Sequence, residues 1–111
     1  MTHKEIEEFI LNLPEAQLDY PFGAEVAVYK VNDKMFALIQ ENSDPLKVSL
    51  KCDPGLSAVL RERYESVMPG YHLNKKHWNT IILTGQLSKA EVEDLIKHSY
   101  LLVSEKNPTA I

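Results

Sequence analysis

Residues 26–39 decide the fold of this chain, and they read Val-Ala-Val-Tyr-Lys-Val-Asn-Asp-Lys-Met-Phe-Ala-Leu-Ile. β-Branched and aromatic residues dominate Val26–Val31, and a second apolar run covers Met35–Ile39. Asn32 and Asp33 separate the two runs, and both residue types tolerate the left-handed backbone that a two-residue turn requires. The stretch therefore predicts a β-hairpin.

Further strands are predicted after the hairpin. Leu46–Lys51 alternates strictly, which is typical of a strand with one face toward a core. We expect Leu46, Val48 and Leu50 to point inward, and Lys47, Ser49 and Lys51 to point outward. Trp78–Thr84 is predicted to be the next strand, closed by Gly85. Val67–Leu73 is irregular or a short edge strand, because Pro69 has no N–H to donate to a ladder.

Three amphipathic helices are predicted, over residues 3–13, 54–65 and 88–104. The first and third begin at capping boxes, Thr2-His3-Lys4-Glu5 and Ser88-Lys89-Ala90-Glu91. In the second, Asp53 is the N-cap and Pro54 takes the first helical position. The buried stripe of this second helix is expected to comprise Leu56, Val59, Leu60 and Tyr64.

The element order is α-β-β-β-α-(β)-β-α, and its short connections favour an antiparallel sheet. We therefore predict a two-layer α+β domain with four to five antiparallel strands and the helices on one face. The core is expected to bury Leu60, Val48, Ile81, Leu83, Leu95 and Ile96 together. A two-residue turn would pair Tyr29 with Phe36, and we expect both rings on the opposite, exposed face with the lysines of residues 46–51.

Length and composition indicate one soluble domain. A chain of 111 residues closes a single core, which we assign to residues 1–105, with 106–111 as a frayed tail. No apolar run reaches the roughly 18–20 residues of a membrane span. The N-terminus lacks the pattern of a signal peptide, and Cys52 has no second cysteine to pair with. We therefore expect a bacterial cytoplasmic protein that is monomeric and has no membrane partner.

One part of this acidic chain has a net positive charge. The formal net charge is −4, which by itself argues against a dedicated nucleic-acid binder. Residues 46–84, however, carry six Lys or Arg against three Asp or Glu, a net charge of +3. Residues 1–45 carry three Lys against nine acids, a net charge of −6. The middle of the chain is therefore the region with a basic balance.

The same region holds the unusual residues of the chain, within Pro69–Thr80. This segment includes the one Trp, two of the four His and an adjacent Lys pair. It contains no nucleophile–base pair, and His72 and His77 have neither metal-ligand spacing nor a Cys or carboxylate beside them. We therefore predict a binding surface rather than an enzyme, with no cofactor and no metal.

Each candidate residue also has a structural interpretation. Lysines suit sequence-independent phosphate contacts, and they also serve solubility. Trp78 and Tyr71 can stack on a base or pack into the core. Asn74 and Asn79 can bond a base edge or their own backbone, and Cys52 is expected to be a small buried residue. The predicted nucleic-acid-binding surface comprises Lys47, Lys51, Tyr71, Asn74, Lys75, Lys76, His77 and Trp78.

Three motifs of this chain resemble the YjbR/MmcQ-like family of small bacterial proteins. They are Tyr20-Pro21-Phe22-Gly23, the run Leu46–Pro54, and Leu73-Asn74-Lys75-Lys76-His77-Trp78. The resemblance covers roughly residues 4–104. It implies a two-layer α+β fold similar to frataxin-like and secretion-chaperone-like proteins, and it implies DNA binding. DNA is therefore the expected partner. The alternative is a protein–protein adaptor that uses the open sheet face, with Tyr29 and Phe36 as anchors.

Overall fold

The predicted hairpin is present in the computed structural model of the protein. Strands β2 (Val26–Val31) and β3 (Lys34–Gln40) pair in antiparallel fashion, and Asn32 and Asp33 form the turn between them. Both turn residues have a positive φ, 52° and 64°. This is the backbone that a tight turn between twisted strands requires, so the prediction is confirmed.

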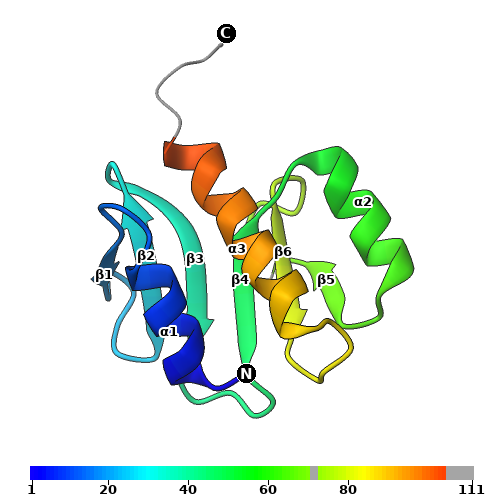
Figure 1. The fold of residues 1–111 in the computed structure, drawn as a ribbon, viewed down its shortest axis with the longest axis horizontal. Helices are drawn as coiled ribbons and strands as arrows, with labels where there is room; N and C mark the ends of the chain where they lie inside the picture. The colour runs from blue at the N-terminus through cyan, green and yellow to red at the C-terminus, as the bar shows by residue number, and fades with distance from the viewer. Residues whose placement is uncertain (71–72, 105–111) are drawn as a thin grey trace, which may run out of the picture.

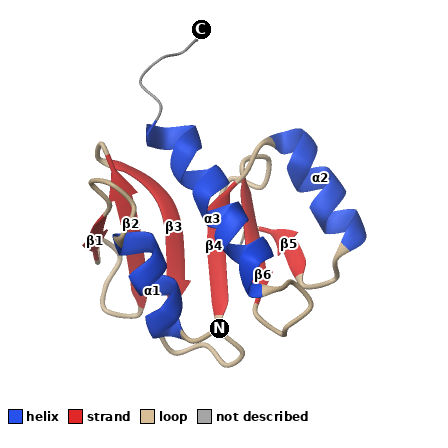
Figure 2. Ribbon diagram, viewed as in Figure 1, coloured by secondary structure: helices blue, strands red, loops and turns tan. Residues whose placement is uncertain are grey.

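The hairpin lies inside an antiparallel sheet with the strand order β1-β2-β3-β4-β6-β5 (Figures 1 and 2). The other strands are β1 (Gln17–Asp19), β4 (Lys47–Lys51), β5 (Val67–Pro69) and β6 (Trp78–Ile82). The structure describes residues 1–70 and 73–104, and within them the sheet has six strands rather than the predicted four to five. Strand β1 is not predicted from the sequence, because its three residues are all exposed and therefore show no apolar alternation.

The helices of the described chain are α1 (His3–Leu11), α2 (Pro54–Arg63) and α3 (Lys89–Ser104), and they cover one face of the sheet (Figure 1). Both capping boxes form. Thr2 Oγ1 accepts from the Glu5 N–H at 3.2 Å, and Ser88 Oγ accepts from the Glu91 N–H at 3.1 Å. Asp53 caps α2 with its carboxylate. The predicted helices and the two-layer α+β architecture are confirmed.

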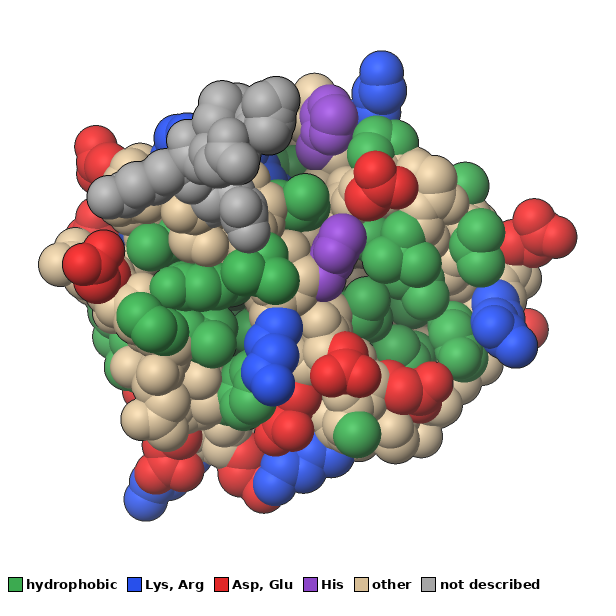
Figure 3. Space-filling model, turned by 45° about the horizontal axis from the view of Figure 1, so that its top comes forward, with side chains coloured by type: hydrophobic (Ala, Val, Ile, Leu, Met, Phe, Trp, Pro, Cys, Tyr) green, Lys and Arg blue, Asp and Glu red, His purple; other side chains and the backbone are tan. Residues whose placement is uncertain are grey.

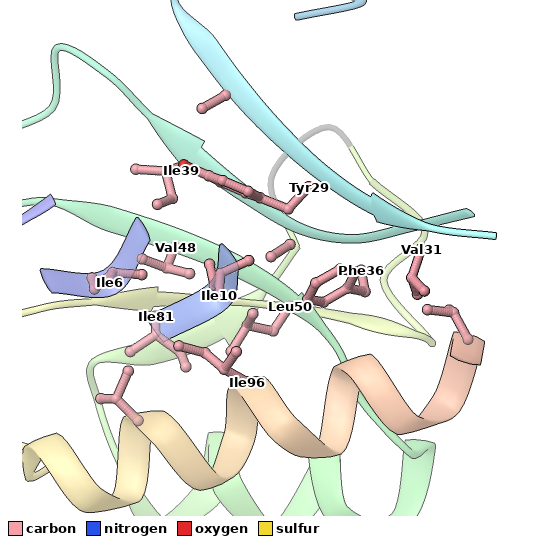
Figure 4. Packing of buried hydrophobic residues seen from close by; sticks show 14 of the residues in the cluster. Ile6, Ile10, Tyr29, Val31, Phe36, Ile39, Val48, Leu50, Ile81 and Ile96 are labelled. Carbon is pink, nitrogen blue, oxygen red and sulfur yellow. The ribbon is translucent and has the colours of Figure 1, made fainter. Parts of the chain in front are cut away.

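The main core lies between the helices and the sheet (Figure 4). Three of the predicted core residues are at most 2% exposed in this cluster: Val48, Ile81 and Ile96. The other three are partly buried and pack against it: Leu60, Leu83 and Leu95. On α2 the predicted buried stripe is wrong at Val59, which is 54% exposed. This helix lies at the end of the layer beside the short strand β5, and of its ten residues only Ser57 is buried.

The predicted register of the hairpin is wrong by one residue. Tyr29 pairs with Ala37 rather than with Phe36, because a β-bulge follows Tyr29. Both rings are fully buried in the main core, where Phe36 packs edge-on against Tyr100 with the ring centroids 5.5 Å apart. The Tyr29 hydroxyl donates to Glu7 Oε2 at 2.6 Å, and burial together with this bond raises the pKa of Tyr29. The exposed pair of rings expected on the opposite face is therefore absent.

The opposite face of the sheet carries a second, smaller apolar cluster. Its buried residues are Val28, Leu38 and Trp78, and Val26, Met35 and Leu73 pack against them. Because Val48 and Leu50 face the helices, alternation along β4 directs Lys47, Ser49 and Lys51 to this opposite face, as predicted. Ser49 Oγ lies 2.8 Å from Thr80 Oγ1 there.

Candidate functional site

The loop between β5 and β6 folds back on the first residue of β6. The Trp78 N–H donates to the Asn74 carbonyl at 3.0 Å, and the Gly70 N–H donates to the Trp78 carbonyl at 2.9 Å. Glycine is required at position 70, since a Cβ atom there would lie 2.6 Å from Trp78 Cβ. Asn74 Oδ1 accepts from the Lys76 N–H at 2.9 Å. The interpretation of Asn74 as a turn residue that bonds its own backbone is therefore confirmed.

Arg61 of α2 holds this loop against the sheet. Its Nε donates to Asn79 Oδ1 at 2.7 Å, and its Nη2 donates to the carbonyl oxygens of Trp78, at 3.0 Å, and of Lys75. Asn79 is only 2% exposed, so its side chain has no access to a base edge. The sequence revealed Arg61 only as a charge, because its partners are mostly backbone carbonyls, which every residue type carries.

Trp78 is buried in the second apolar cluster. It is 5% exposed and packs with Val28 and Leu38. A nucleic-acid base has no access to a ring in this position, so of the two predicted roles the structure shows packing. Lys51 Nζ lies 5.9 Å from the ring centroid, within the range of a cation–π contact.

Two of the lysines predicted to contact phosphate, Lys51 and Lys75, lie on different elements near Trp78. Lys51 lies opposite Trp78 in the β4–β6 ladder. Lys75 belongs to the loop, and its Nζ donates to the Gly70 carbonyl at 3.4 Å. Lys76, the next residue, is exposed. The fold thus brings the end of β4 and the lysine pair of the loop to the same region of the molecule.

The remaining predicted site residues lie at different distances from the end of β4. His77 is exposed, and its carbonyl accepts from the Cys52 N–H at 2.8 Å, so it stays beside the end of β4. Lys47 lies four residues before Lys51, which corresponds to about 13 Å along the strand. Tyr71 lies outside the described residues.

A groove of about 300 Å³ opens where β4 passes into α2. It is lined by Lys51, Cys52, Asp53, Pro54, His77 and Leu102. The Asp53 N–H donates to His98 Nε2 at 3.1 Å, which ties the start of α2 to α3. Cys52 is 4% exposed, and burial raises the pKa of its thiol, so the expectation of a small buried residue is confirmed. Figure 3, tilted toward this end, shows histidine side chains among hydrophobic ones.

Neither a metal centre nor a membrane-spanning helix occurs in the described chain. Within residues 1–70 and 73–104, no three His, Cys, Asp or Glu side chains form a group that could hold a metal ion. No helix in the same part is long and apolar enough to cross a bilayer.

Replacing Arg61 by methionine is expected to loosen the loop. Methionine keeps much of the side chain's length but removes every donor, which leaves the buried Asn79 Oδ1 without its partner. Such a loss costs about 1–3 kcal/mol of unfolding free energy. We expect this loss in urea unfolding, together with altered Trp78 fluorescence. The matched control is Arg63→Met, at an exposed position of the same helix, which should change stability by less than about 0.5 kcal/mol. Equal effects would contradict the role of Arg61.

Relatives of known sequence share most of this chain. The sequence profile of the YjbR family matches residues 11–102. YbdF of Escherichia coli O157:H7 is 39% identical over 101 residues, which cover 91% of this chain and 83% of YbdF. YjbR of Escherichia coli K12 is 34% identical over 100 residues, which cover 90% of this chain and 85% of YjbR. Neither name states an activity.

Solved structures share the fold. A crystal structure of a Deinococcus radiodurans protein with a DUF419 domain has a TM-score of 0.90 at 39% identity. The match covers 96% of this chain and 80% of that one. A crystal structure of a Pseudomonas syringae protein has a TM-score of 0.81 at 29% identity, and covers 93% and 99% of the two chains. Sequence and fold thus agree over nearly the whole length.

Proposed function

The chain belongs to the YjbR family, and from that premise we propose that it binds nucleic acid without performing chemistry on it, with DNA as the expected partner. The contacts go to phosphate groups. Trp78 takes no part in base stacking, because its ring is buried. The residues proposed to make or border these contacts are Lys47, Lys51, Asn74, Lys75, Lys76 and His77.

The observation that carries this proposal is the position of the loop that Arg61 holds. The two hydrogen bonds of Arg61 to loop and strand carbonyls place Lys75 and Lys76 near the end of β4, where Lys51 lies. Cations fixed on a preformed surface lose less conformational entropy on binding than cations on a disordered segment. Lysine is also a point charge without a directional fork, which suits contacts to the phosphate backbone of any sequence.

The charge distribution favours a weak and salt-sensitive interaction. The basic region of residues 46–84 belongs to a chain whose overall charge is −4. Asp53 lines the groove beside Lys51, although its carboxylate accepts a hydrogen bond from the Leu56 N–H at 3.1 Å. Because the rest of the surface repels a polyanion, attraction depends on a few local contacts, and these weaken as salt is added.

The adaptor hypothesis loses its predicted anchors. It relied on exposed Tyr29 and Phe36 rings on the open sheet face. Both rings are 0% exposed and pack in the main core under the helices. These anchors are therefore wrong, and phosphate binding is the function we propose.

The lysine pair of the loop provides the direct test. We expect Lys75→Ala and Lys76→Ala each to weaken binding to every DNA sequence by a similar factor. Each should also reduce the slope of log affinity against log salt by about 0.9 for a duplex, since one released counterion is lost per contact. Salt-titrated fluorescence anisotropy with labelled duplex and single-stranded oligonucleotides measures both quantities.

The matched control for this pair is Lys89→Ala. Lys89 is exposed and its Nζ lies 3.9 Å from Glu5, at the start of α3 and away from the loop. Its removal should leave both the affinity and the salt slope unchanged. Absence of binding by the unmodified protein at low salt, or equal losses in all three variants, would refute the proposed function.

A further inference from the structure

We propose that the groove between the end of β4, the start of α2 and the last turn of α3 accepts one unpaired nucleotide. The base lies against Pro54, Leu102 and the His77 ring, and the phosphate lies toward Lys51. Where the nucleotide belongs to a nucleic-acid strand, this inference rests on the proposed function. It deepens that function, because it makes single-stranded nucleic acid the preferred partner.

The size and lining of the groove fit such a ligand. Its volume of about 300 Å³ lies at the lower end of the range for small-molecule sites, which are mostly apolar with a few placed polar groups. Cys52, Pro54 and Leu102 supply the apolar surface, and Lys51 is a cationic residue of the lining, with its Nζ 5.9 Å from the centroid of the Trp78 ring. Leu102 is 47% exposed, so the apolar wall is open to a ligand from solvent.

The walls of the groove are held by hydrogen bonds from neighbouring elements. The Cys52 N–H donates to the His77 carbonyl at 2.8 Å, which joins the floor to the loop wall. The Asp53 N–H donates to His98 Nε2 at 3.1 Å, and the Lys51 N–H donates to Ser99 Oγ at 2.9 Å. Both of these partners belong to α3. The groove is thus formed before a ligand arrives, which lowers the entropic cost of binding.

The charges in and around the groove orient the nucleotide. Lys51 is the lining cation, and Lys75 and Lys76 lie on the adjoining loop. Asp53 is the lining anion and would repel a phosphate at the start of α2. Burial raises the pKa of the Cys52 thiol, so the floor adds no negative charge. Phosphate is therefore favoured toward Lys51 and the loop, and the base toward Pro54 and Leu102.

An unpaired base is required because stacking needs a free ring face. Proteins recognise single strands by stacking splayed bases on aromatic side chains, histidine included. Trp78 is 5% exposed and excluded from this role, whereas His77 is exposed and lines the groove. A base inside a duplex is already stacked on both faces and cannot enter.

The groove is tested first with thymidine 5′-monophosphate, by an amide NMR titration of the full chain. We expect saturable shifts centred on Lys51, Cys52, Asp53, His77 and Leu102. Inorganic phosphate is the parallel probe, and it should bind more weakly and leave the Leu102 signal unmoved. Shifts of the same size and place with phosphate alone, or no saturable shift at these residues with the nucleotide, would overturn the proposal.

Single-stranded oligo(dT) and a duplex of equal length form the second test, with neighbouring residues as controls. Leu102→Ala should weaken binding of the single strand by about five-fold or more, since it removes apolar contact area with the base, and leave duplex binding unchanged. Leu101→Ala should change neither, since Leu101 is similarly exposed, at 49%, but does not line the groove. Lys51→Ala should cost more single-strand affinity than Lys47→Ala, which removes a lysine of the same strand outside the groove.

The two proposals fail in different ways. Equal binding of single strand and duplex, with equal effects of the two leucine variants, would overturn the groove and leave phosphate binding in place. Saturable binding of the mononucleotide at the groove, without binding of either polymer, would refute the proposed function and support the groove as a site for a free nucleotide. The leucine variants replace exposed side chains, so circular dichroism is expected to show an intact fold.

Discussion

Replacing Trp78 by alanine is expected to destabilise the protein by about 3–5 kcal/mol, as is typical when a large aromatic side chain is removed from a packed site. The ring is 5% exposed and packs with Val28 and Leu38 on the face of the sheet opposite the helices. The contact of the ring with Lys51, at 5.9 Å, is lost as well. Urea unfolding followed by far-UV circular dichroism measures the effect, since the variant has no other Trp to report by fluorescence.

Trp78→Phe is the matched control for this prediction. Phenylalanine retains an aromatic ring in the small cluster, so we expect clearly less destabilisation than with alanine. If Trp78→Ala costs less than about 1 kcal/mol, the ring is not packed as described and is available to a ligand. Any loss of nucleic-acid affinity in the alanine variant must be compared at a temperature where the variant is folded, because unfolding alone reduces binding.

Ile96→Ala is expected to cost about 2–5 kcal/mol of unfolding free energy. Ile96 is 0% exposed and lies in the main core between α3 and the sheet, together with Val48 and Ile81 (Figure 4). Truncation removes apolar contacts and leaves a cavity that close-packed neighbours fill only in part. Urea unfolding of the variant and the unmodified protein provides the measurement.

Two leucines on helices calibrate this result. Leu60→Ala should cost less than Ile96→Ala, because Leu60 is only partly buried against the core. Leu101→Ala, at a 49% exposed position of α3, should fall within about 0.5 kcal/mol of the unmodified protein. A loss below about 0.5 kcal/mol at both Ile96 and Leu60 would show that the helix faces are assigned wrongly.

The local elements of the fold were predictable from the chain because their causes are local. Asn32 and Asp33 adopt the positive φ of a tight turn. Thr2 and Asp53 cap helices α1 and α2, as predicted from the sequence. These features depend on residues within a few positions of one another. Strand β1 lacks such a signal, since it is three exposed residues long and exists only because β2 offers an edge to pair with.

The candidate site was predictable as a set of residue types and not as a surface. The lysines, His77 and Asn74 were identified from composition and from the family resemblance, and they are exposed or half-buried in the structure. Whether the side chains of Trp78 and Asn79 are accessible to a ligand was not predictable, because their burial depends on which side chains from distant parts of the chain cover them. The role of Arg61 had no signal, since its acceptors are largely backbone carbonyls.

The sequence by itself determined the hairpin, the three helices, the alternation of Leu46–Lys51 and the basic balance of residues 46–84. Periodicity and capping are short-range properties, so residue order suffices to specify them. Tertiary structure alone decided the rest. A β-bulge between Tyr29 and Lys30 shifted the partner of Tyr29 to Ala37, and packing under the helices buried both Tyr29 and Phe36, since burial depends on which elements cover a strand face. Packing likewise buried Trp78 and brought Leu102 to the groove beside His77, since burial depends on contacts between residues far apart in the chain.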